Sequence, residues 1–165
     1  MSPGRMLRHL VAWFRPARSH FNTAVRTVIE QEITRAERTH SGEICFAVES
    51  ALGPAMLWRG VSSRQRALQV FAQQGVWDTR ANNGVLIYVL LADQAVELVA
   101  DRGIAVHVPE PEWRALCAQV EALYRNGDYQ DGSIAAIRGA ARWLTLHFPP
   151  DGADRNELPN QPILL

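Results

Sequence analysis

The sequence contains no lysine, only two cysteines and no long apolar run. Its 17 basic residues, all arginine, are balanced by 17 acidic residues, whereas nucleic-acid-binding domains usually carry a basic excess. The cysteines, Cys45 and Cys117, form no C-x-x-C pair and are too few for a disulfide framework, which fits a reducing compartment. The longest apolar run, residues 85–92, is too short to span a bilayer. These absences predict a cytoplasmic protein that does not bind nucleic acid.

Common catalytic and metal-binding signatures are also missing. The sequence has no H-E-x-x-H zinc motif, no EF-hand loop and no phosphate-binding G-x-x-x-x-G-K-[ST] loop. It has no G-x-S-x-G elbow, so a serine hydrolase is not supported. A phosphatase would need an activated nucleophile or a metal-bound water, and the sequence indicates neither. No catalytic residue is therefore predicted.

The chain divides into three parts by composition and charge. Residues 1–20 form a basic amphipathic segment, and residues 1–26 hold five arginines and no acid, while the remainder carries 12 arginines against 17 acids. This segment lacks the apolar core and cleavage site of a secretory signal, so we expect none. Residues 21–148 have the patterning of one globular domain. Residues 149–165 hold four of the nine prolines, and we expect this tail to be disordered.

The spacing of apolar residues within the domain predicts an α/β fold. Helices are expected over residues 21–39 (with Ser19 as N-cap), 55–59, 62–74, 111–126 and 131–147, and strands over 43–49, 84–91 and 95–100. The first two strands are joined by a helical crossover and should be parallel, and the third follows a tight turn and should be an antiparallel edge. Helices on both faces of this small mixed sheet give a three-layer αβα sandwich.

Polar residues gather at both ends of the predicted hairpin. Asn82 and Asn83 precede the buried second strand, whereas Asp101 and Arg102 follow the third. We predict that these four residues, with Asp78, bind a ligand at the edge of the sheet, because binding sites collect on loops held by a rigid scaffold. Ordinary turn formation by the asparagines and a surface ion pair are the competing explanations. Trp77, next to Asp78, is interpreted as a core aromatic residue.

The N-terminal segment is a second candidate site. It combines apolar residues with arginines, and the predicted contact residues for an anionic membrane or a protein partner are Arg5, Arg8, Trp13, Phe14, Arg15 and Arg18. A helix that simply packs on the domain would explain the same pattern. The sequence leaves the two explanations open.

Five segments, taken in order, resemble the TPM domain family, which is named for a thylakoid-lumen protein, a photosystem-associated protein and a nematode receptor modulator. They are SGEICFAVE, ALQVFAQQGVWDT, NNGVLIYVLL, VELVADRGI and GDYQDG before the last helix, within residues 22–148. The resemblance implies an αβα sandwich and mixed activities: some plant members are acid phosphatases, some members bind calcium, and others act through partners. Bacterial members often carry a signal peptide, a transmembrane segment and a Gly-rich tail, and this chain resembles a short bacterial version without them.

The chain departs from the family pattern at the expected site. Asn82 stands where the family often has aspartate, and Asp101 and Arg102 precede Gly103 where threonine or serine is common. A calcium site needs six or more oxygen ligands, so Asn82 and Asp101 would form only a weak one, and Arg102 favours an anion over a cation. The resulting hypothesis is a non-catalytic accessory module at the cytoplasmic face of the inner membrane, with a LemA-like or other TPM-domain membrane protein as partner. The alternatives are a weak metal-dependent acid phosphatase and a calcium-binding structural domain.

Overall fold

A mixed sheet forms the centre of the computed structural model, which describes residues 3–14, 17–150 and 156–165. Its strands are β1 (Ile44–Glu49), β2 (Val85–Leu90), β3 (Ala95–Ala100) and β4 (Ile163–Leu164), in the spatial order β3-β2-β1-β4. β2 runs parallel to β1 and antiparallel to β3, as the sequence predicts, while β4 adds a second parallel pairing to β1.

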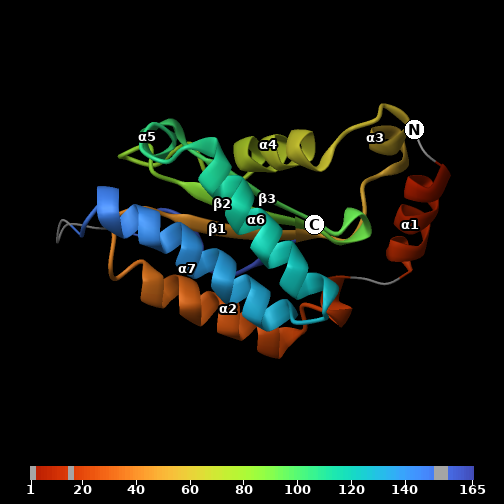
Figure 1. Cartoon of the computed structure of the whole chain (residues 1–165), viewed down its shortest axis with the longest axis horizontal. Helices are drawn as coiled ribbons and strands as arrows, with labels where there is room; N and C mark the ends of the chain where they lie inside the picture. Colours follow the sequence, from red (N-terminus) through yellow and green to blue (C-terminus); the bar gives the residue numbers. More distant parts are fainter. Residues whose placement is uncertain (1–2, 15–16, 151–155) are drawn as a thin grey trace.

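Helices cover both faces of this sheet and make a three-layer αβα sandwich (Figure 1). Along β1 the side chains alternate, so that Phe46 and Val48 enter one core and Cys45 and Ala47 the other. The first core is covered by α2 (Thr23–Ala36), α6 (Glu110–Arg125) and α7 (Tyr129–His147), and the second by α3 (Pro54–Trp58) and α4 (Ser63–Gln73). The predicted fold class is confirmed.

Capping residues set where the helices begin. Ser62 caps α4 in a capping box with Gln65, at the position that the sequence indicates. For α2 the expected cap, Ser19, is wrong: Ser19 closes a short 3₁₀ helix, η1 (Ala17–Ser19). Asn22 caps α2 instead, and its side-chain oxygen accepts a hydrogen bond from the Val25 N–H at 3.0 Å. The preceding 3₁₀ turn moves the start of α2 past Ser19.

The β2–β3 connection is tight although it has no glycine. A 3₁₀ turn, η2 (Leu91–Asp93), leads into Gln94, which takes the left-handed conformation at φ 51°. After β3 the chain turns directly into α5 (Arg102–Ala105), a short helix that the sequence does not predict. Asp101 caps it by accepting a hydrogen bond from the Arg102 N–H at 2.7 Å. This turn places Arg102 at the end of the sheet.

The expectation of a disordered tail is wrong for residues 156–165. The carboxylate of Glu43 accepts hydrogen bonds from the N–H groups of Glu157 (3.0 Å) and Leu158 (3.2 Å). The chain then adds β4 to the edge of β1, and the Leu165 N–H donates to the Val48 carbonyl at 2.9 Å. The proline content suggested disorder, but prolines are tolerated at sheet edges, and Pro162 directly precedes this edge strand.

The N-terminal helix α1 (Pro3–Trp13) lies beside η2, at one end of the molecule (Figure 1). It therefore packs on the domain, as one of the two explanations of this segment requires. None of the helices in the described part of the chain is long and apolar enough to cross a membrane.

Candidate functional site

The two polar ends of the hairpin meet at the end of the sheet opposite α1. The β2–β3 register pairs Val85 with Ala100, and the Asp101 N–H donates to the Gly84 carbonyl at 2.9 Å. One residue further on, the Arg102 guanidinium donates through Nε to the Asn82 side-chain oxygen at 3.0 Å. Asn82, Asn83, Asp101 and Arg102 therefore gather in one place, which we call the rim.

Backbone contacts fix the shape of the rim. The Gly103 N–H donates to the Asn82 carbonyl at 2.8 Å, so the start of α5 is fastened to the loop before β2. Asn82 adopts a left-handed conformation with φ 52°, which asparagine tolerates better than most residues. Thr79 holds the same loop, because its hydroxyl accepts a hydrogen bond from the Asn83 N–H at 3.1 Å and its carbonyl one from the Asn82 N–H at 3.1 Å. Sequence reasoning missed Thr79, since a lone threonine in a turn gives no distinctive signal.

Buried polar groups lie directly behind the exposed part of the rim. Asn83 is fully buried, and its amide nitrogen donates to the Ser41 carbonyl at 2.9 Å. Its side-chain oxygen and one oxygen of Asp101 are buried without a hydrogen-bond partner among the described residues. His40, next to Ser41 in the chain, is 0% exposed, and both of its ring nitrogens also lack a partner there. Burial lowers the pKa of His40 to about 4, against a smaller opposing effect of the Gly42 backbone, so the ring is neutral.

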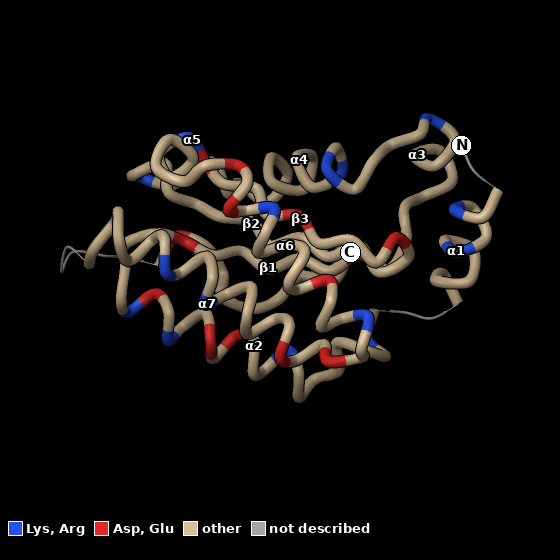
Figure 2. The backbone as a smooth tube through the Cα atoms, in the orientation of Figure 1, with Lys and Arg blue, Asp and Glu red and all other residues tan. Residues whose placement is uncertain are grey.

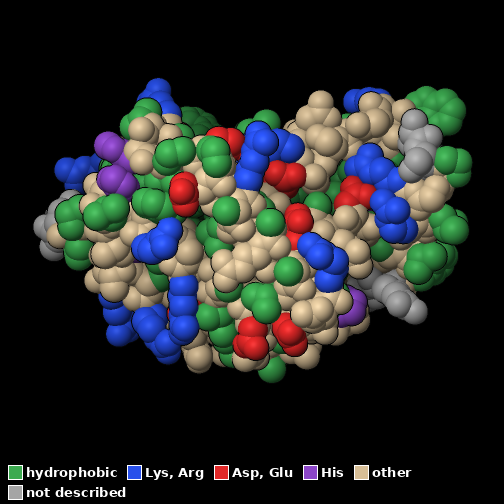
Figure 3. Space-filling model, viewed as in Figure 1, with side chains coloured by type: hydrophobic (Ala, Val, Ile, Leu, Met, Phe, Trp, Pro, Cys, Tyr) green, Lys and Arg blue, Asp and Glu red, His purple; other side chains and the backbone are tan. Residues whose placement is uncertain are grey.

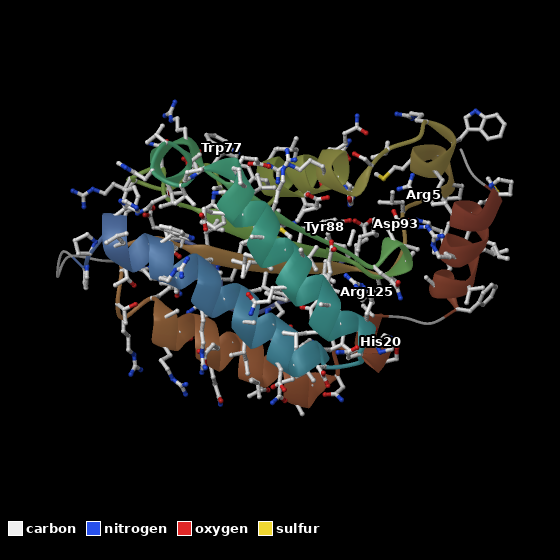
Figure 4. All side chains as sticks on the ribbon, viewed as in Figure 1. Arg5, His20, Trp77, Tyr88, Asp93 and Arg125 are labelled. Atoms are coloured by element: carbon white, nitrogen blue, oxygen red, sulfur yellow. The ribbon has the colours of Figure 1, made fainter. Side chains whose placement is uncertain are left out.

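Two residues near the rim lie where the sequence did not place them. Trp77, expected in the core, is 54% exposed (it is labelled in Figure 4). Asp78 is an exposed turn residue whose N–H donates to the Gly75 carbonyl at 2.9 Å. No contact joins Asp78 to Asn82 or Arg102 among the hydrogen bonds and ion pairs of the described residues. Asp78 therefore borders the rim in sequence without taking part in its bonding.

The rim does not have the donor set of a calcium site. The Asn82 oxygen already accepts a hydrogen bond from a guanidinium, and one Asp101 oxygen accepts one from the Arg102 N–H. The two side-chain oxygens that remain, one each from Asp101 and Asn83, are far from the six to eight oxygens that calcium takes. Within the described residues, no group of three or more His, Cys, Asp or Glu side chains is placed to hold a metal ion. The exposed Arg102 instead gives the rim one group suited to an anion.

The second predicted site, around α1, has its arginines turned partly inward. The Arg5 Nη2 atom lies 2.7 Å from an Asp93 carboxylate oxygen, and Arg8 lies 3.6 Å from the other oxygen. Arg5 and Asp93 are labelled in Figure 4. Burial alone would raise the pKa of Asp93, but hydrogen bonds from Arg5 and His9 outweigh it and hold this pKa below its ordinary value. Arg5 is thus first of all an anchor of α1.

The aromatic residues of this segment point outward instead. Trp13 is exposed and Phe14 is 82% exposed, and Arg18 is exposed as well. Arg15 lies outside the described residues. The predicted contact residues therefore fall into two groups. Arg5 attaches α1 to the domain, whereas Trp13 and Phe14 lie on an outer, largely apolar surface.

A sandwich of this topology with a loop-built rim defines a small α/β domain with a candidate binding edge. The chain matches the model of the TPM domain over residues 18–142, and it belongs to the TPM domain family. No curated protein sequence matches it.

Among solved structures, the chain is similar to the BA42 protein from the psychrophilic bacterium Bizionia argentinensis, determined by NMR. The two share 27% sequence identity with a TM-score of 0.76, over 87% of this chain and 94% of that one. The likeness spans nearly the whole of the other chain and supports the same arrangement of layers.

Proposed function

We propose that this TPM-domain protein is a non-catalytic binding module that contacts a protein partner through the rim. The observation that carries the proposal is that Arg102, held by its bond to Asn82, and the neighbouring Val106 are both exposed at the rim. Val106 directly follows α5 and is 78% exposed. Arginine is among the residues that protein interfaces use most, and Val106 adds exposed apolar area beside it.

The two cysteine thiols and the buried His40 also favour binding over catalysis. Burial raises the pKa of the Cys45 and Cys117 thiols to about 12, so neither is a thiolate nucleophile near neutral pH. His40 is buried and neutral. A group in this position serves packing rather than proton transfer to a substrate in solution.

The partner that we propose is a LemA-like or other TPM-domain membrane protein, met at the cytoplasmic face of the inner membrane. The test is quantitative capture of partners from native membranes by the immobilised full chain, with Arg102→Ala and Arg125→Ala as matched variants. Arg125 is exposed on α6 towards the other end of the molecule (Figure 4). We expect Arg102→Ala to reduce recovery of a membrane protein by roughly tenfold and Arg125→Ala to leave it unchanged. Equal recovery by both variants, or no reproducible partner, would count against the proposal.

A weak metal-dependent acid phosphatase is the alternative, favoured by the anion-suited Arg102 bonded to Asn82. Turnover of p-nitrophenyl phosphate with calcium, with magnesium and with EDTA distinguishes it. Activity that needs a metal and disappears in Asp101→Ala, while the circular dichroism spectrum is retained, would establish the phosphatase. We expect no turnover in any of the three conditions, because the rim lacks a nucleophile and a metal-ligand cluster within the described residues.

A calcium-binding structural domain is the remaining alternative from the sequence. In that case calcium would bind the native state selectively, and adding calcium would raise the melting temperature of the protein. The donor set of the rim leads us to expect no shift with millimolar calcium.

A further inference from the structure

Helix α1 is attached to the domain by its polar side. His9 is 0% exposed, and its Nδ1 accepts a hydrogen bond from the Leu52 N–H at 3.0 Å. Its Nε2 therefore carries the ring hydrogen and donates to Asp93 at 3.1 Å. Arg5 reaches the same carboxylate and also donates to the Val61 carbonyl at 2.8 Å. Helices of globular proteins usually bury the apolar side, so α1 has the reverse orientation.

The apolar side of α1 faces solvent as a consequence. Figure 3 shows hydrophobic side chains gathered at the edge of the molecule over α1 and α3. The Arg5 bond to Val61 fastens α1 to the segment that follows α3, and Trp58 of α3 is 81% exposed. We call this the α1 surface; its exposed apolar residues are Met6, Leu7, Leu10, Val11, Trp13, Phe14 and Trp58. Single exposed apolar residues are ordinary, but a whole helix side of them marks an interaction site.

The charges around the α1 surface are basic. Arg8 has 57% of its side chain exposed, and Arg18 and Arg59 are exposed. The first 26 residues contain no acid, and the nearby Asp93 is neutralised by Arg5 and by its bond to His9. Basic positions on α1 are visible in Figure 2. Aromatic and aliphatic side chains flanked by arginine are the combination that binds the surface of an anionic bilayer.

We propose that the α1 surface docks on an anionic lipid bilayer, with α1 lying in the plane of the headgroups. This deepens the proposed membrane-face role and rests on it, since it names the lipid chemistry and the part of the chain that touches it. A second copy of the chain fits less well, because a symmetric contact through the same surface would bring the arginines of both copies together. An 11-residue helix is about 16 Å long, so the attachment is peripheral and reversible.

Co-sedimentation of the full chain with vesicles tests the proposal. The vesicles are phosphatidylcholine alone or phosphatidylcholine with about one third phosphatidylglycerol, where the anionic lipid supplies the negative surface potential. We expect binding to the mixed vesicles and at least roughly tenfold weaker partitioning to the neutral ones, since several arginines near the surface contribute. The double variant Leu10→Ser/Phe14→Ser should partition roughly tenfold or more less strongly than the wild type, since two large apolar side chains no longer enter the bilayer.

The matched control is Leu68→Ser/Leu146→Ser, which changes two exposed leucines on α4 and α7. Thermal melting confirms that both double variants fold. The proposal is overturned if the wild type does not sediment with the mixed vesicles, or if the control pair loses binding equally. It is also overturned if the wild type forms a dimer in size-exclusion chromatography that Leu10→Ser/Phe14→Ser dissociates. Arg102→Ala should keep vesicle binding while it loses partner capture, so failure of the lipid contact and failure of the rim contact are told apart.

Discussion

At Gly103 the chain passes so close to the loop before β2 that a side chain has no room. A Cβ atom there would lie 2.5 Å from the Asn82 carbonyl oxygen and 2.6 Å from that of Ala81. Both neighbours are backbone atoms, so Gly103→Ala must push the two sides of the rim apart. We expect it to lower the free energy of unfolding by about 1–3 kcal/mol, measured by urea denaturation. Gly53→Ala is the control, because nothing lies within 4 Å of a Cβ there; an equal loss in both variants would contradict the close approach.

His40 makes the stability depend on pH. Burial lowers its pKa in the folded state to about 4 from an ordinary value of 6.5, so the unfolded chain binds the proton more tightly. Stability is therefore complete above pH 6.5 and falls as the pH drops towards 4. Between pH 7 and pH 5 we expect a loss of about 2 kcal/mol in the free energy of unfolding. His40→Gln should flatten this part of the profile in urea denaturation, and an unchanged slope would show that other groups cause it.

The residues of the rim were only partly predictable. Asn82, Asn83, Asp101 and Arg102 could be chosen from the sequence because they flank strands whose pairing brings strand ends together. The role of Thr79 could not, because a lone threonine in a turn gives no distinctive signal. The burial of His40 could not either, because it results from the packing of the folded chain. Asp78 likewise makes no bond to the rim because of the path that its loop takes, and the spacing of apolar residues does not predict the path of a loop.

At the scale of elements, local signals found the strands and long helices but missed elements that depend on distant partners. The capping box at Ser62 and the apolar run of β2 each depend only on residues that are close together in the sequence, so the sequence predicts them. β4 has only two residues, and it forms because it pairs with β1 and because Glu43 binds the backbone of Glu157 shortly before it. The polar attachment of α1 similarly requires Asp93, which is more than 80 residues away.

The C-terminal segment should therefore contribute measurably to stability. Deleting residues 156–165 removes two backbone donors from Glu43 and leaves the edge of β1 without β4. Hydrogen bonds to a charged group contribute about 1.5–3 kcal/mol each, so for two of them we expect a loss of about 3–6 kcal/mol in the free energy of unfolding by urea denaturation. Glu43→Gln, which keeps the shape and removes the charge, should give a smaller loss. A truncated chain as stable as the wild type would show that residues 156–165 do not contribute to the free energy of unfolding.

The attachment of α1 depends on one carboxylate. Asp93→Asn removes the charge that Arg5 and His9 face, and we expect amide hydrogen exchange in α1 to accelerate by at least roughly tenfold while the sheet stays protected. Because the folded-state pKa of Asp93 is lowered, the wild type should keep its attachment at neutral pH and lose it only as the pH falls below the ordinary value of 3.8. Exchange measured by mass spectrometry checks both statements. Uniform acceleration over the whole chain would mean that α1 does not open separately.

At the scale of the whole molecule, the rim and the α1 surface lie at opposite ends of the same strand. β2 has six residues, with Val85 at the rim and Leu90 next to η2, where α1 is attached. At about 3.3 Å per residue, the five steps from Val85 to Leu90 separate the two ends by about 17 Å. A bilayer that holds the α1 surface therefore leaves the rim pointing into the aqueous phase, where a partner can reach it.

Maleimide labelling of single cysteines tests this orientation in a background where Cys45 and Cys117 are replaced by alanine. With mixed phosphatidylcholine–phosphatidylglycerol vesicles present, labelling of a Leu7→Cys chain should slow by roughly tenfold, because the bilayer covers that position. Labelling of an Arg102→Cys chain should change by less than about twofold, since the rim stays in water. Protection at both positions would mean that the molecule lies on its side, with the rim against the lipid. Because the sheet and its helices form one sandwich, the end that touches the bilayer decides which end a partner meets.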